Sequence, residues 1–132
     1  RINEKLIAGV EYASLNEHEL LYVSGKENVQ RAGECLLNRG IRQIFVKLGS
    51  KGSMYISRNA QVYKEPLKIK PIDTTGAGDS FTAGCIYGLL NDFSVDEILH
   101  FANTCGAFTC TRKGTTEAFP TLEDIEHFKS IC

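Results

Sequence analysis

The segment most suited to chemistry is residues 73–81, which read DTTGAGDSF. Behind it, residues 80–91 (SFTAGCIYGLLN) have the apolar spacing and the small residues of a helix that packs closely against another element. A helix N-terminus exposes unpaired backbone N–H groups and carries a partial positive charge. Glycines there let a phosphate approach the backbone without meeting a Cβ atom. We therefore expect Gly76, Ala77 and Gly78 to form an anion-holding turn at the start of this helix.

Asp79 is the most informative residue of the segment. Its carboxylate would repel a bound phosphate, so phosphate binding alone does not favour an acid at this position. Beside a hydroxyl that attacks phosphorus, however, a carboxylate can accept or orient the proton, while backbone amides stabilise charge on the transferring group. The alternative is that Asp79 only caps the helix and the glycines only form a turn. The neighbouring Asp73, Thr74 and Thr75 and the small-residue helix favour the catalytic interpretation.

The composition is that of an ordinary globular protein and excludes several classes of partner. The 132 residues are 42% hydrophobic and 23% charged with a formal net charge of -1, so neither nucleic acid nor an anionic membrane is expected as a partner. No stretch approaches the ~20 apolar residues of a membrane span, and the first residues lack a secretory hydrophobic region. The five cysteines include no C-x-x-C pair, which favours free thiols in a reducing cytoplasm over a zinc site. The chain opens in charged residues without a methionine, so we expect a piece of a longer protein.

Strand-like and helix-like segments alternate along the chain. Strands are predicted over residues 6–15, 41–49, 54–57 and 60–69, and helices over 28–39, 80–91 and 121–130, with a further helix opened by the capping-box pair Ser94 and Glu97. Residues 111–120 read as a loop. This alternation predicts a layered α/β fold with a mainly parallel sheet.

Several segments of the sequence resemble those of a known family. The run DTTGAGDSFTAG closely resembles the C-terminal signature of the ribokinase-like (PfkB) carbohydrate kinases. NEHE at 16–19, VKLGSKGS at 46–53 and FANTCGAFTCTRKGTTEAFP at 101–120 resemble three further family segments, in the family's order. The resemblance implies a three-layer ribokinase-like α/β fold with a mainly parallel sheet. It also implies that residues 1–132 are the C-terminal ATP-binding and catalytic portion, and that the N-terminal sugar-binding and lid part is absent.

The resemblance implies an ATP-dependent kinase that phosphorylates a hydroxyl of a sugar or nucleoside. Asp79 would be the catalytic base, and residues 76–78 with the amide of Asp79 would be the anion hole. Asn16 and Glu19 would place the ATP phosphates and hydrated Mg²⁺, with Glu19 contacting the metal through water. Taken alone, however, N-x-x-E is most often a helix cap.

Further nucleotide contacts follow from the resemblance. Gly49 and Gly52 would let ATP lie against backbone, although they could equally form an ordinary hairpin turn. Asn103 would flank the adenine, or could be a simple exposed helix residue. Lys47 stands where family members often have a threonine that reaches the phosphates, and a lysine would reach them as a point charge.

The resemblance also implies a monovalent-cation site, with K⁺ as the candidate ion. Asp73 and the carbonyl of Thr75 match this site, and the loop from Arg112 to Gly114 would close it. Ala118 stands where some members offer a hydroxyl to the cation, which places potassium activation in question. Alternatively, Arg112 and its neighbour Lys113 are a solvated loop pair with no role at a cation site.

Three classes of function are thus open from the sequence. The first is the kinase, cytoplasmic, with a homodimer as a candidate state of the intact enzyme and with the fragment alone expected to be inactive. The second is a non-catalytic nucleotide-binding module, which would have no need of a base at Asp79. The third is a generic α/β domain that binds no ATP. The sugar or nucleoside itself cannot be read, because most of the residues that recognise it would lie in the missing part.

Overall fold

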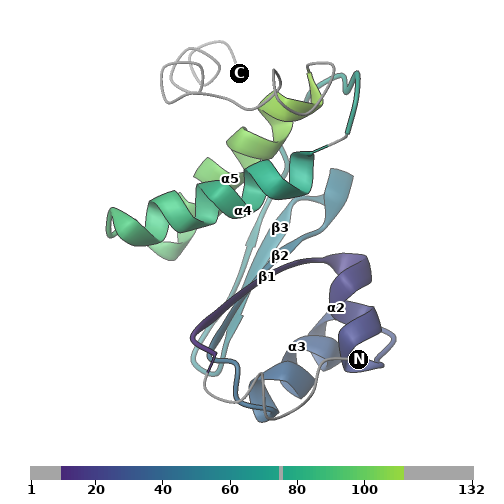
Figure 1. Cartoon of the computed structure of the whole chain (residues 1–132), viewed down its shortest axis with the longest axis vertical. Coiled ribbons are helices and arrows are strands. Elements are labelled where there is room, and N and C mark those ends of the chain that lie inside the picture. The colour runs from purple at the N-terminus through teal and green to yellow at the C-terminus, as the bar shows by residue number, and fades with distance from the viewer. Residues whose placement is uncertain (1–9, 75, 112–132) are drawn as a thin grey trace. The chain divides into compact units, whose positions relative to one another are not determined.

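A computed structural model describes residues 10–74 and 76–111 of the chain. The chain divides into two compact units, Arg1–Tyr63 and Lys64–Cys132. The elements of the first unit are β1 (Tyr12–Asn16), α2 (Glu17–Ser24), α3 (Val29–Asn38), β2 (Gln43–Lys47), the 3₁₀ turn η1 (Gly49–Lys51), β3 (Ser53–Ser57) and β4 (Gln61–Lys64), the last of which ends one residue beyond the boundary. The second unit carries α4 (Ala77–Leu90) and α5 (Val95–Cys110) (Figure 1).

The strands form one sheet in the order β1-β2-β3-β4. β1 and β2 are parallel, with Asn16 opposite Lys47, whereas β2 and β3 are antiparallel. The α/β class is therefore confirmed, but the described strands form a mixed sheet rather than a mainly parallel one. The reason lies in the connections, because the short turns after β2 and β3 leave no room for the crossover that a parallel pair requires.

The first unit has a core on one face of the sheet, beneath α2 and α3. The alternate residues Ile44 and Val46 of β2 pack there with Ile56 of β3, against buried leucines such as Leu20 and Leu36 from the two helices. The α3 helix begins after Asn28, whose side chain accepts from the backbone N–H of Arg31, and it ends close to the predicted boundary. The predicted first strand is observed at 12–16, and the part of it before residue 10 lies outside the described residues.

On the opposite face of the same strands lies an aromatic group. The ring of Phe45 is 1% exposed; it stacks on Tyr12 at a centroid distance of 6.4 Å and packs at a tilt of 55° against Tyr55 at 5.2 Å. Because side chains alternate along a strand, Phe45 faces away from Ile44 and Val46. Both faces of β2 are therefore covered, as its short continuous apolar run predicts.

The second unit is built on a close pair of helices, α4 and α5, which lie side by side in Figure 1. A Cβ atom added to Gly84 would lie 2.8 Å from the Cα of Ala102, so only glycine permits this approach. Buried hydroxyls of Ser80 and Thr109 form a hydrogen bond of 2.6 Å between the helices. The small residues of α4 thus serve the predicted close packing.

The start of α5 follows the capping box expected from the sequence. Ser94 Oγ accepts from the N–H of Glu97, and the Glu97 carboxylate accepts from the N–H of Ser94. This backbone donor, followed by the Ser94 side chain, lowers the pKa of Glu97.

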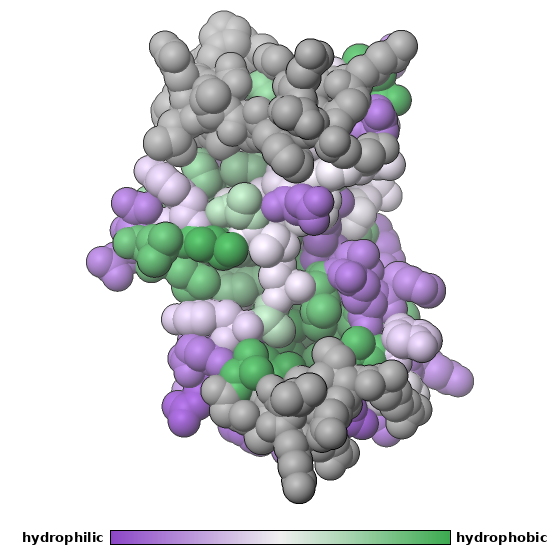
Figure 2. Space-filling model, viewed as in Figure 1, coloured by the Kyte–Doolittle hydropathy of each residue, from purple (hydrophilic) through white to green (hydrophobic). Residues whose placement is uncertain are grey.

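Some apolar side chains remain on the surface of the second unit. Figure 2 shows hydrophobic residues on the exposed surface of the helix pair, and Ile86 and Leu90 of α4 are 52% and 77% exposed. Among the residues that the structure describes, no helix is long and apolar enough to cross a membrane.

Candidate active site

The glycine run forms the N-terminus of α4, three residues earlier than the predicted helix start. Gly76 is the N-cap with φ 80°, a left-handed conformation that favours glycine. The N–H of Ala77 donates to the carbonyl of Thr74 at 3.2 Å, and the N–H of Ser80 donates to the carbonyl of Gly76 at 3.0 Å. The predicted turn and the first helical turn are therefore one structure, since Ala77 and Gly78 already belong to the helix.

Gly78 is not explained by the protein around it. Its φ is not in the left-handed region, and a Cβ atom added there would have no atom within 4 Å. A glycine inside a helix costs up to about 1 kcal/mol relative to alanine. Within the described residues, neither backbone conformation nor packing accounts for this cost. The open space in front of Gly78 is the space that a ligand would need to reach the backbone.

Asp79 lies on the same first turn and is exposed to solvent. No hydrogen bond or ion pair joins its side chain to the described part of the chain, and no side-chain capping bond forms at this helix end. The N–H groups of Gly78 and Asp79 also have no acceptor among residues 10–74 and 76–111. An exposed carboxylate therefore lies at a helix N-terminus beside two amides that have no acceptor among the described residues.

Asn16 and Glu19 form a reciprocal capping box at the start of α2, in the first unit. Asn16 Oδ1 accepts from the N–H of Glu19 at 2.7 Å, and Glu19 Oε1 accepts from the N–H of Asn16 at 2.9 Å. The structural alternative for N-x-x-E is thus confirmed. Both side chains are exposed, and in the described part of the chain Asn16 Nδ2 and Glu19 Oε2 keep no partner. The cap leaves these two atoms available to a ligand.

The segment from Lys47 to Gly52 starts at the last residue of β2. It lies at the same end of the strands as Asn16, because β1 and β2 are parallel. Gly49 has φ 62° with open space beside it, and Gly52 has φ 104° and is buried. The turn is closed by the N–H of Leu48, which donates to the carbonyl of Gly52 at 2.8 Å. Lys47 is half-buried, lies opposite Asn16 in the parallel pair, and makes no ion pair with any described residue.

One contact at this end of the strands is not apparent from the sequence. Lys51 Nζ lies 3.0 Å from Glu17 Oε1, although the two residues are 34 positions apart. Opposite charges at such a separation give no signal in the sequence, because only the parallel pairing of β1 and β2 brings them together.

Two further residues of the predicted site, Asn103 and Asp73, lie in the second unit. The amide nitrogen of Asn103 donates to the carbonyl of Glu65 at 3.0 Å, so one of its groups is already bonded within the second unit. Asp73 is half-buried, and its N–H donates to the carbonyl of Cys110 at 3.1 Å.

Three residues of the predicted cation site, Thr75, Arg112 and Gly114, lie outside the described residues, as does Ala118. Within the described ranges, no cluster of three or more His, Cys, Asp or Glu side chains could hold a metal ion.

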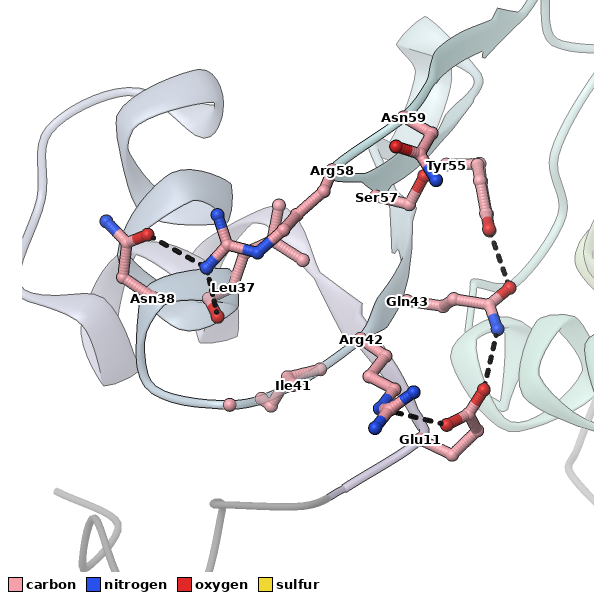
Figure 3. Close-up of a pocket in the computed structure, with 11 residues that line it drawn as sticks. Glu11, Leu37, Asn38, Ile41, Arg42, Gln43, Tyr55, Ser57, Arg58 and Asn59 are labelled. Carbon is pink, nitrogen blue, oxygen red and sulfur yellow. Dashed lines mark hydrogen bonds and ion pairs between the residues drawn. The ribbon is translucent and has the colours of Figure 1, made fainter.

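A hollow of about 720 Å³ lies at the other end of the strands, between the end of α3, the start of β2 and the turn after β3. In Figure 3, Arg42 turns toward Glu11, with Nε 3.6 Å from Oε2, whereas Arg58 turns toward the end of α3 and donates to the carbonyl of Leu37. The two guanidinium groups have separate partners and do not converge. This hollow therefore presents no focused site for an anion.

Comparisons with known proteins identify the family and the fold. A model of the pfkB family of carbohydrate kinases matches residues 3–122. Probable fructokinase-4 of Arabidopsis thaliana is 31% identical over 124 residues, which cover 88% of this chain and 38% of that protein. The crystal structure of ribokinase from Thermotoga maritima has a TM-score of 0.91 at 30% identity, covering 98% of this chain and 45% of that one. Arabidopsis thaliana ribokinase complexed with ribose and ATP has a TM-score of 0.87 at 28% identity, covering 96% and 43%. The chain thus spans less than half the length of these proteins.

Proposed function

The chain belongs to the pfkB family of carbohydrate kinases and has a ribokinase-like α/β fold, and from this premise we propose that the intact protein transfers the γ-phosphoryl group of ATP to a hydroxyl of a sugar or nucleoside. Residues 1–132 are then its nucleotide-binding and catalytic portion, and this portion alone is inactive because the sugar-binding part lies elsewhere. We include a cytoplasmic location in the proposal.

The observation that carries the proposal is the N-terminus of α4. Gly78 has no packing or conformational reason to be glycine within the described residues, and Asp79 beside it is exposed without a partner there. A helix terminus that served only the fold would gain stability from alanine at position 78. A terminus that meets a phosphate needs bare backbone, which explains the glycine.

The chemistry follows from these groups. The carboxylate of Asp79 accepts the proton of the attacking hydroxyl as the new O–P bond forms and the bond from the γ-phosphorus to ADP breaks. In the predicted anion hole of residues 76–79, the N–H groups of Gly78 and Asp79, which have no acceptor among the described residues, donate to the oxygens of the transferring group. The positive end of α4 adds to this stabilisation.

The first unit supplies the groups that we propose to contact the ATP phosphates. Asn16 Nδ2 and the Lys47 ammonium are the donors for phosphate, and the Gly49–Gly52 turn offers backbone against which ATP lies. Glu19 Oε2, left over from the capping box, suits Mg²⁺ through a bound water, because Mg²⁺ prefers oxygen ligands and keeps several of its waters. When bound, Mg²⁺ neutralises charge on the phosphates. Asn103 would flank the adenine.

A monovalent-cation site is a further part of the proposed function, independent of the catalytic role of Asp79. Asp73 and Thr75, with the loop from Arg112 to Gly114, would hold K⁺. It is tested independently, by comparing turnover in potassium and sodium salts.

The decisive experiment is Asp79→Asn in the full-length protein. The change keeps the shape of the side chain but removes its ability to take the proton. We expect kcat to fall by about 10²- to 10⁴-fold while the Kd for ATP-Mg changes by less than a few-fold. Turnover that survives within a few-fold would show that Asp79 is not the base.

Measurements on the wild-type protein distinguish the kinase from the alternative, a non-catalytic nucleotide-binding module. Isothermal titration with ATP-Mg and a phosphorylation assay over a panel of sugars and nucleosides are the two measurements. ATP binding without turnover on any member of the panel would favour the module.

A further inference from the structure

We propose that the ion pair between Glu17 and Lys51 is a positioning element for the nucleotide. It sets the place of the Gly49–Gly52 turn relative to the start of α2. The inference rests on the proposed function, in which both segments contact ATP. In this role neither Glu17 nor Lys51 contacts the substrate directly.

The contact is bidentate and joins two segments of the first unit. Lys51 Nζ lies 3.0 Å from Glu17 Oε1 and 3.3 Å from Oε2. On its other side, the carbonyl of Lys51 accepts from the hydroxyl of Tyr63, close to the end of β4. The last residue of the η1 turn thus contacts both α2 and β4.

The topology explains why this pair couples the two halves of the nucleotide site. β1 and β2 are parallel, and their last residues, Asn16 and Lys47, lie opposite one another. Glu17 follows Asn16 directly, and the η1 turn begins two residues after Lys47. The ion pair therefore joins the capping box at the end of β1 to the glycine turn at the end of β2.

The turn is closed on itself by the N–H of Leu48, which donates to the carbonyl of Gly52, but this bond does not join the turn to α2. Gly49 and Gly52 both adopt positive φ, and a Cβ atom on Gly49 would touch nothing within 4 Å. Glycine leaves the backbone more conformational freedom than any other residue. Holding the turn in one place before ATP arrives reduces the ordering cost of binding.

A positioning role and a direct charge effect predict opposite effects of Glu17→Met on the affinity for ATP, which makes the proposal testable. If Glu17 acted on ATP only through its charge, Glu17→Met would tighten ATP binding and Lys51→Met would weaken it, so that the double variant would resemble the wild type. If the pair positions the turn, both single variants lose the same tie. The double variant should then be no worse than either single one.

The experiment uses the full-length protein, with ATP Kd from calorimetry and with KM and kcat from initial rates. We expect Glu17→Met, Lys51→Met and the double variant each to raise the Kd and KM for ATP by roughly two- to five-fold, the range typical of an exposed ion pair. The value of kcat should stay within two-fold. Arg42→Met is the matched control, because it breaks an exposed ion pair with Glu11 at the opposite end of β2 and should leave the KM for ATP unchanged.

Two results would overturn the inference while leaving the proposed function intact. One is tighter ATP binding by Glu17→Met, and the other is an unchanged KM in both single variants. Failure of the proposed function looks different, because the wild-type protein itself would then show no ATP binding or no turnover.

Discussion

Replacing Gly78 by alanine separates the stability of α4 from its function. Gly78 lies on the first turn of the helix, has no positive φ, and has open space where the new methyl group would go. The substitution therefore strains nothing in the described part of the protein. It places a carbon atom directly in front of the backbone that we propose to meet the transferring phosphoryl group.

The two effects have different magnitudes. Alanine is favoured over glycine in a helix by up to about 1 kcal/mol, so the free energy of unfolding should rise by about 0.5–1 kcal/mol and Tm by about 1–3 °C. Losing one backbone donor to a transition-state oxygen costs about 10²- to 10³-fold in kcat. The variant should be slightly more stable and severely impaired.

The assay combines thermal unfolding with initial-rate kinetics on the full-length protein. Gly84→Ala is the matched control on the same helix, because its methyl group would lie 2.8 Å from the Cα of Ala102 on α5. The crowding involves backbone that cannot turn away, so this variant should lose about 1–3 kcal/mol of stability. The kcat of its folded fraction should stay close to that of the wild type.

One outcome would refute the reasoning about Gly78. If Gly78→Ala is stable and keeps kcat/KM within three-fold of the wild type, no phosphoryl group approaches this backbone. The glycine would then be a feature of the helix alone, and the anion hole would have to be sought elsewhere.

Two further predictions concern the buried interior of the second unit. Thr109→Val should destabilise the protein by about 1–3 kcal/mol, measured by urea unfolding, because it leaves the buried Ser80 hydroxyl without its 2.6 Å partner. Burial, and then the charge of nearby Cys105, raise the pKa of Cys85 from 9.0 to about 12, so in the native protein at pH 8 this thiol should resist iodoacetamide, as judged by mass spectrometry after digestion. Since the folded-state pKa is raised, the stabilising contribution of the neutral thiol is complete below about pH 9 and is lost as the pH rises toward 12, which a titration of unfolding against Cys85→Ala would show.

Features that depend on neighbouring residues were predictable from the sequence. The Ser94–Glu97 capping box was expected and is confirmed by hydrogen bonds in both directions. The helix after Asn28 was likewise expected, because its apolar period and the glycine at position 40 lie within a few turns of chain. Such features are set by contacts three or four residues apart, which a linear sequence displays.

The boundaries and the strand directions were less predictable. The helix after the glycine run begins at Ala77 rather than near Ser80, since Gly76 takes the left-handed N-cap conformation and lets the following residues join the helix. The described sheet is mixed because turn lengths, not strand composition, decide whether neighbouring strands are parallel.

By itself, the sequence determined the chemical character of this protein. It put a carboxylate next to bare backbone at a helix start, and it supplied the motifs that place the chain in its family. Only the tertiary structure decided which glycine serves which purpose. Gly78 and Gly84 lie in one helix and look alike in the sequence, but α5 crosses close to Gly84 and leaves Gly78 open. The physical reason is that close approach is a property of two segments, and the partner of Gly84 comes from the next helix of the chain.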